Sequence, residues 1–221
     1  MNDNSKTERV LSQQESMKFS GKVTASISHE IKNVLAIINE NAGLLQDISG
    51  MIEEGFVLSP QRLSAIALKI ENQIARANDI ISRLNRFAHS VDEEILEFDI
   101  YEVIDYMTKI FDRIGKLRGL KVDLIKPGEL IRIKTNLFTF QYLIWHCLDF
   151  ASKNINKETI LGISINFENN FYYIIFNFSE ELFDKESFET FIENEKVILD
   201  TLAGKLLPGI DDKEFRLAIS I

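Results

Sequence analysis

The sequence predicts an α+β protein: an N-terminal antiparallel helical hairpin, paired into a dimeric four-helix bundle, followed by an α/β sandwich. Three features indicate this fold: a four-three apolar rhythm in two long segments, a break between them, and mixed helix and strand patterns after residue 99. We divide the chain into a polar N-terminal extension (1–16), the hairpin (17–90), an acidic connector (91–98) and the α/β domain (99–221).

The composition favours a globular, cytoplasmic protein. Hydrophobic residues make up 45% of the 221 residues, and no stretch approaches the ~20 apolar residues of a membrane span or resembles a signal peptide. The net charge of −9 comes without a basic stripe, which makes nucleic acid a poor partner. Cys147 is the single cysteine, so we expect no disulfide and interpret Cys147 as a buried packing residue. The three histidines lack the spacing of metal ligands, so we expect no metal site.

In the hairpin we expect two helices of about 30 and 28 residues, separated by a break that contains Gly50, Gly55 and Pro60. Each helix has a seam of residues at alternating steps of four and three: Ile27, Ile31, Val34, Ile38, Asn41, Leu45 and Ile48, then Leu63, Ala67, Ile70, Ile74, Ala77, Ile81 and Leu84. Further apolar residues flank the first seam, so one partner helix cannot cover it and we expect a homodimer. Asn41 either helps to set the register or is solvated.

The second domain reads as helix, two strands, helix, two strands, helix, strand. We predict helices over 100–120, 138–152 and 183–202, and strands over 120–125, 130–135, 159–168, 170–178 and 215–221, with turns at Pro127–Gly128 and Asn169–Asn170. This order indicates a mixed sheet with helices on one face.

His29 is the residue that suits a chemical role. It lies two positions after Ile27, about 200° around the helix, and should face solvent. An imidazole nitrogen is nucleophilic near neutral pH and leaves readily once phosphorylated, which suits reversible phosphoryl transfer. Glu30 could hold the ring tautomer, and Asn33 could position a phosphate or a water. We expect a partner protein to contact the small and basic residues beside the ring: Lys22, Ala25, Ser26, Lys32 and Ala36. The alternative is a histidine that is merely solvated.

The segment Ser28-His29-Glu30-Ile31-Lys32-Asn33 resembles the H-box of the dimerisation and histidine-phosphotransfer domain of bacterial sensor histidine kinases. The resemblance covers residues 17–90, and the order of elements extends it to a catalytic and ATP-binding domain. It implies that His29 accepts the phosphate, that Glu30 is the adjacent acid, and that Asn33 can assist hydrolysis of a partner's phosphoaspartate. Val34 replaces the usual proline and so removes a helix bend.

The ATP-binding half departs from that family. Where the family has asparagines for magnesium, the segment HCLDFA has His146 and Phe150, and a phenyl ring cannot ligate magnesium. Asn177 and the residues after it replace the family's aspartate and glycines, no glycine occurs between Gly162 and Gly204, and residues 180–195 hold seven acids against one base. We therefore expect a degenerate domain without a cofactor, and Mg²⁺ supplied by the partner's receiver domain.

These features predict a histidine phosphotransferase of a two-component phosphorelay, which shuttles phosphate between receiver-domain aspartates through His29. It resembles the stand-alone phosphotransferases of sporulation and cell-cycle phosphorelays. The alternatives are a response-regulator phosphatase or pseudokinase scaffold, a divergent active histidine kinase, and a coiled-coil adaptor whose H-box match is accidental. The expected partners are response-regulator receiver domains and a second copy of the chain.

Overall fold

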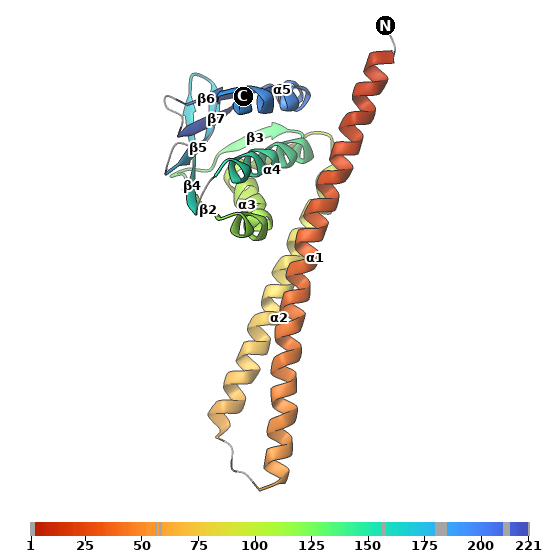
Figure 1. Ribbon diagram of the computed structural model, residues 1–221, viewed down its shortest axis with the longest axis vertical. Coiled ribbons are helices and arrows are strands. Elements are labelled where there is room, and N and C mark those ends of the chain that lie inside the picture. Colours follow the sequence, from red (N-terminus) through yellow and green to blue (C-terminus); the bar gives the residue numbers. More distant parts are fainter. Residues whose placement is uncertain are drawn as a thin grey trace. The chain divides into compact units, whose positions relative to one another are not determined.

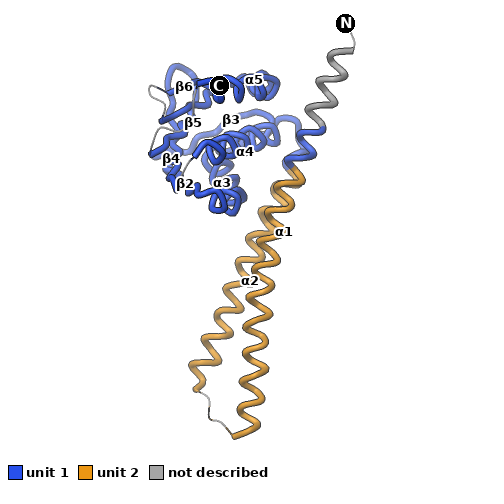
Figure 2. Tube along the Cα trace, in the orientation of Figure 1, with its two compact units in different colours: residues 1–19, 90–221 blue, residues 20–89 orange. Residues whose placement is uncertain are grey.

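The computed structural model of the chain divides into two compact units, residues 20–89 and residues 1–19 with 90–221 (Figures 1 and 2). It describes residues 3–55, 57, 59–155, 158–179, 185–209 and 213–220, with side chains from residue 14 onward. Within the described residues, no helix is both long enough and apolar enough to cross a bilayer.

The unit of residues 20–89 is an antiparallel helical hairpin, as predicted. It is built from α1 (Asp3–Glu53) and α2 (Pro60–Ala88). The break lies where the sequence places it: Gly55 has a φ of 94°, and Pro60 begins α2 at a position where its missing N–H costs nothing. With 51 residues, α1 is longer than expected. The polar extension 1–16 is helical from Asp3 because it contains no residue that stops a helix.

The predicted seam of α1 is confirmed. Ile27, Val34, Asn41 and Ile48 are buried, and the seam residues between them are half-buried. Asn41 is therefore not solvated: its side-chain amide donates a hydrogen bond of 2.7 Å to the carbonyl oxygen of Ile37 in its own helix.

The predicted seam of α2 is only partly correct, since Ile70, Ala77 and Leu84 are half-buried but Leu63, Ala67, Ile74 and Ile81 are exposed. The buried residues are Ile66, Ile80 and Phe87, whereas Ile74 and Ile81 are 48% and 44% exposed. The buried residues lie seven or fourteen positions apart, and the polar, half-buried Gln73 occupies the position between Ile66 and Ile80. A search for apolar residues alone therefore misses this buried line. The predicted stripe lies beside it and is largely uncovered.

The second unit is an α+β domain with a mixed sheet, which confirms the predicted fold class. Its five-stranded sheet has the order β2-β4-β5-β7-β6, and only the β2–β4 pair is parallel. The strands are β2 (Leu120–Leu124), β4 (Thr159–Glu168), β5 (Phe171–Phe178), β6 (Gly204–Pro208) and β7 (Glu214–Ser220). A separate antiparallel pair joins β1 (Leu96–Asp99) to β3 (Arg132–Thr135).

Three helices cover one face of the large sheet: α3 (Ile100–Leu117), α4 (Leu137–Lys153) and α5 (Lys185–Thr201) (Figure 1). Residues of β4 accordingly alternate between buried and more exposed from Thr159 to Ile165. Cys147 on α4 is completely buried, as expected, and burial raises the pKa of its thiol.

The sequence missed two short strands and one short helix. The missed helix is a 3₁₀ helix (His89–Val91), which ends where the predicted connector 91–98 begins. The strand β1 lies at the end of that connector, and β6 follows shortly after α5. The first predicted helix of this domain, 100–120, ends at Leu117 because the chain turns at Gly119, which has a φ of 82°. The predicted start of α5 at residue 183 and the end of the last strand at 221 lie outside the described residues.

Candidate functional site

His29 lies on α1 in the hairpin unit and is half-buried. Its Nδ1 has no solvent exposure and no hydrogen-bond partner among the described residues. Nε2 is not among the buried atoms that lack a partner, so we consider it as the ring nitrogen that could react. The expectation of a fully solvent-facing ring was too simple, because His29 lies one turn after Ser26, only about 60° around the helix from it, and Ser26 is buried.

The face around the ring is otherwise open. Lys22, Ala25, Lys32, Asn33 and Ala36 are all exposed. The prediction for Ser26 is wrong, since it is only 3% exposed and cannot be reached by a partner. Its small side chain lies next to Ile27 on the side of α1 that the hairpin buries. Apart from the two lysines, the exposed neighbours on this face, Ala25, Asn33 and Ala36, have small or medium-sized side chains.

The two residues expected to assist His29 differ in their environments. Glu30 is half-buried and takes part in other interactions, and it does not accept a hydrogen bond from Nδ1 of His29. Asn33 is exposed one turn further along α1, on the same side as the ring. Asn33 is therefore accessible to a group that approaches the ring, whereas Glu30 already takes part in another interaction.

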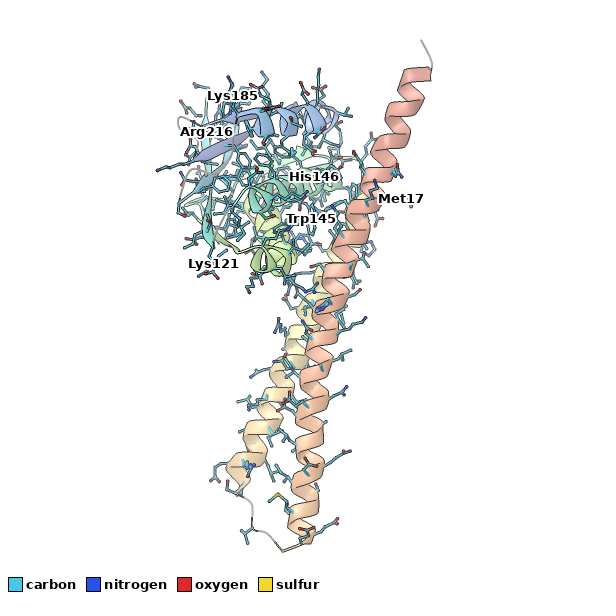
Figure 3. All side chains as sticks on the ribbon, viewed as in Figure 1. Met17, Lys121, Trp145, His146, Lys185 and Arg216 are labelled. Carbon is cyan, nitrogen blue, oxygen red and sulfur yellow. The ribbon has the colours of Figure 1, made fainter. Side chains whose placement is uncertain are left out.

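In the other unit, His146 and Phe150, which the sequence comparison places where the family has magnesium ligands, lie in different environments. His146 on α4 accepts or donates a 2.5 Å hydrogen bond between Nδ1 and Oε1 of Glu195 on α5. Figure 3 shows His146 beside Trp145, among the densely packed side chains of this unit. Glu195 is 4% exposed, and its other oxygen is buried without a partner. The pair thus joins α4 to α5.

Phe150 is packed into an aromatic cluster. Its ring stacks on Phe191 of α5 with centroids 4.5 Å apart and meets Phe215 of β7 edge-on at 5.8 Å. Phe215 in turn stacks on Phe176 of β5 at 4.6 Å. These side chains fill the space between α4, α5 and the sheet, so Phe150 has a packing role.

Two further groups on α4, Tyr142 and Asp149, have pKa values shifted by their surroundings. Burial raises the pKa of the Tyr142 hydroxyl, and the nearby carboxylates of Glu195 and Glu15 raise it further. Burial also acts to raise the pKa of Asp149, but hydrogen bonds from Lys153 and Arg118 outweigh it and hold that pKa below its ordinary value. The Arg118 bond, 2.7 Å long, fastens the end of α3 to α4.

Sequence reasoning missed Glu195 as the partner of His146. It treated residues 180–195 as one repulsive acidic surface, although Glu180, Glu181 and Asp184 lie outside the described residues. The signal was present: Phe188, Phe191, Glu195 and Leu199 recur at steps of three and four, and all four are buried. Within the described residues, no group of three or more metal-ligating side chains comes together.

No protein-family model matches the chain, and no curated protein matches it in sequence. Solved structures do match it. The catalytic domain of the histidine kinase ThkA, in a nucleotide-free form, has a TM-score of 0.50 and 14% identity, over 58% of this chain and 96% of that one. The Acinetobacter baumannii histidine kinase AdeS gives 0.45 at 14% identity, over 87% and 97%. ThkA in complex with the response regulator protein TrrA gives 0.49 at 16% identity, over 100% and 67%. The α+β unit of this chain therefore has the fold of a histidine kinase catalytic domain.

Proposed function

We propose that the chain is a histidine phosphotransferase of a two-component phosphorelay, and that His29 carries the phosphate between aspartates of receiver domains. The observation that supports this most is the state of the ring. Nδ1 is covered by protein, and the half-buried ring lies on a helix face of exposed small, basic and amide side chains. A helix holds the imidazole rigidly, which suits a transfer that depends on positioning.

The transfer step follows from this arrangement. The lone pair of Nε2 attacks the phosphorus of a receiver's aspartyl phosphate, the N–P bond forms, and the P–O bond to the aspartate breaks with its electron pair on the leaving carboxylate. Nδ1 keeps its proton, so the ring becomes a cation that offsets the incoming charge. The reverse step delivers the phosphate to a second receiver. Mg²⁺ would come with the receiver, and we place the activity in the cytoplasm.

Charge beside the ring supports an acidic partner. Lys22 lies two turns before His29 and Lys32 about one turn after it, and both are exposed. Two cations on the approach face attract a phosphoryl group and an acidic receiver surface, and they draw the encounter toward the ring. Glu30 would accept a hydrogen bond from the Nδ1–H group of His29 after a rotamer change and thereby stabilise the attacking tautomer.

A homodimer is the assembly that fits the hairpin. The uncovered stripe on α2 includes Leu63, Ala67, Ile74 and Ile81, and Leu35 on α1 is 50% exposed. Long apolar stripes on both helices of a hairpin are the pattern that a four-helix bundle buries. We propose that a second copy covers them.

We also propose that the chain does not draw its phosphate from ATP. The side chains at the positions that would hold magnesium do not fit the ion: Phe150 has no oxygen and is packed against Phe191, and the carboxylate of Glu195 is buried against His146. No step of the transfer above passes through a nucleotide.

The direct test is incubation with a receiver domain phosphorylated by acetyl phosphate, followed by detection of acid-labile phosphohistidine. We expect label on the wild-type chain and none on His29→Ala. His89→Ala is the matched control, since it removes another exposed histidine of the same hairpin unit. Equal labelling of His29→Ala and the wild type would refute the proposal.

A receiver phosphatase is the second candidate, and the exposure of Asn33 beside the ring favours it. An amide there could orient a water toward the partner's phosphoaspartate. In that case the receiver would lose phosphate without label on His29, and Asn33→Ala would abolish the loss. Transfer with label on His29 that survives Asn33→Ala would exclude it.

A further inference from the structure

One edge of β4 is left without a neighbouring strand. β4 runs to Glu168, but β2 pairs with it only as far as Leu124 opposite Ile163. The last bond on that side is donated by the backbone N–H of Ile125 to the carbonyl oxygen of Ile163. From Ser164 to Glu168, β4 therefore has β5 on one side and, among the residues that the structure describes, no strand on the other.

The direction of the free backbone groups follows from that last bond. Backbone groups of alternate residues in a strand point to the same side. Since the carbonyl of Ile163 points toward β2, the N–H and C=O groups of Ile165 and Phe167 point to the same, uncovered side. No hydrogen bond joins these groups to another described residue on that side.

A cavity of about 700 Å³ lies against this edge. The segment between β2 and β3 forms one wall and the end of β4 the other, and the lining residues are Ile125, Pro127, Gly128, Glu129, Ile131, Ser164, Ile165, Asn166, Phe167, Glu168 and Tyr172. At about 3.3 Å per residue, a segment of three to five extended residues would match the free length of β4. The space therefore lies beside the free backbone groups of β4 and extends to Tyr172 of β5.

The other outer strand of the sheet, β6, shows how an edge is usually protected. β6 carries an exposed lysine and ends in proline, Lys205 and Pro208, both of which discourage pairing with another chain. The free edge of β4 contains neither residue type, and it presents Phe167 with 55% of its surface exposed. An unprotected edge beside a cavity is the arrangement used to accept an added strand.

We propose that this groove accepts an extended segment of a partner protein, which adds to β4 as a strand and carries alternating apolar and basic side chains. The apolar side chains would contact Ile125, Ile131 and Ile165. The basic side chains would lie near Glu129 and Glu168, which are the charged residues that line the cavity. Lys126 belongs to the same loop but is exposed and does not line the cavity.

The peptide acetyl-Val-Lys-Val-Lys-Val-amide, labelled with a fluorophore, provides the first test with the full-length chain. We expect saturable binding by fluorescence anisotropy. A peptide methylated on alternate backbone nitrogens keeps the side chains but cannot donate to β4, and it should bind at least about tenfold more weakly. Replacing the lysines by glutamates should weaken binding as well, because the groove is acidic.

Two variants of Phe167 separate the contribution of its backbone N–H to peptide binding from that of its side chain. Phe167→Pro removes the N–H that faces the groove and leaves the pairing with β5 intact, because that N–H does not point toward β5. It should weaken peptide binding at least about tenfold, whereas the matched Phe167→Ala keeps the N–H and should weaken it less.

Three results would overturn the proposal: no binding of the lysine peptide to the wild type, equal binding by Phe167→Pro, or equal binding of the methylated peptide. If Phe167→Pro does not fold by circular dichroism, the methylated peptide on the wild-type chain still decides. Stronger binding of the glutamate peptide would overturn the assigned charge.

Discussion

His29 and His146 stand in opposite environments. His29, on the hairpin, is half-buried on a helix face of exposed small and basic residues, and its Nδ1 has no hydrogen-bond partner among the described residues. His146, in the α+β unit, is held by a buried glutamate at 2.5 Å, next to an aromatic cluster. The ring of His29 is therefore partly accessible on the hairpin, whereas His146 and Phe150 take part in the packing of the other unit. A domain with the fold of a histidine kinase catalytic domain can thus have His146 and Phe150 packed against its own side chains. The four changes below test how far the two units differ.

The largest effect is expected at Phe150, where the aromatic cluster closes the α+β unit. Phe150→Ala should lower the free energy of unfolding by about 3–5 kcal/mol, since it leaves a cavity among Phe191, Phe188 and Phe215. Urea unfolding monitored by circular dichroism measures this. A loss below about 1 kcal/mol would show that the cluster is not tightly packed.

A change on the hairpin should act on assembly instead. Replacing Ile74 and Ile81 by glutamate places charges in the proposed dimer interface, and we expect the dimer dissociation constant to rise at least about 100-fold, or about 2.7 kcal/mol. Sedimentation velocity measures the dimer. Leu68→Glu, at another exposed leucine of α2 that lies outside the predicted stripe, is the control. A wild-type monomer would refute the dimer itself, and an unchanged dimer would refute the assigned face.

His146→Ala tests the pair that joins α4 to α5. It leaves the buried carboxylate of Glu195 without its hydrogen-bond partner, so we expect a loss of about 1–3 kcal/mol in the free energy of unfolding. A second change, Glu195→Leu, removes the stranded carboxylate and should recover part of that loss. If the double variant is less stable than the single one, the carboxylate has another role. Phosphate transfer through His29 should persist in both variants.

The smallest effect is expected from Asp149, and it depends on pH. The pKa of Asp149 is lowered in the folded protein, so its ion pairs stabilise the fold above the ordinary value of 3.8 and lose that effect as the pH falls through the lower folded pKa. Asp149→Asn should cost about 1 kcal/mol at neutral pH, because its partner Arg118 is partly exposed. Thermal melts at neutral and strongly acidic pH should show the difference shrinking in acid. A constant difference would contradict the assignment.

The sequence indicated the fold where its signals were strong and local. The seam of α1, the turn at Asn169–Asn170 with φ values of 51° and 63°, and the strand 159–168 were all located correctly. Short elements were missed because four or five residues such as β1 and β6 carry too little periodicity to stand out. The α2 seam was located only in part because the polar Gln73 interrupts the buried line.

The candidate site was only partly predictable for a similar reason. The residues on one helix face follow from spacing, and five of them are exposed as expected. The burial of Ser26 and of Nδ1 of His29 depends on how the hairpin packs, which spacing on a single helix does not describe. The pairing of His146 with Glu195 joins residues 49 positions apart and depends on the packing of α5 against α4.

The central claim is that His29 receives phosphate from a receiver and not from a nucleotide. The most direct measurement offers the wild-type chain two donors in parallel, magnesium with labelled ATP and a labelled phosphoreceiver, and maps any phosphohistidine by mass spectrometry. We expect phosphate on His29 from the phosphoreceiver alone. Phosphate on His29 from ATP, or phosphate from the receiver on a different residue, would contradict the account.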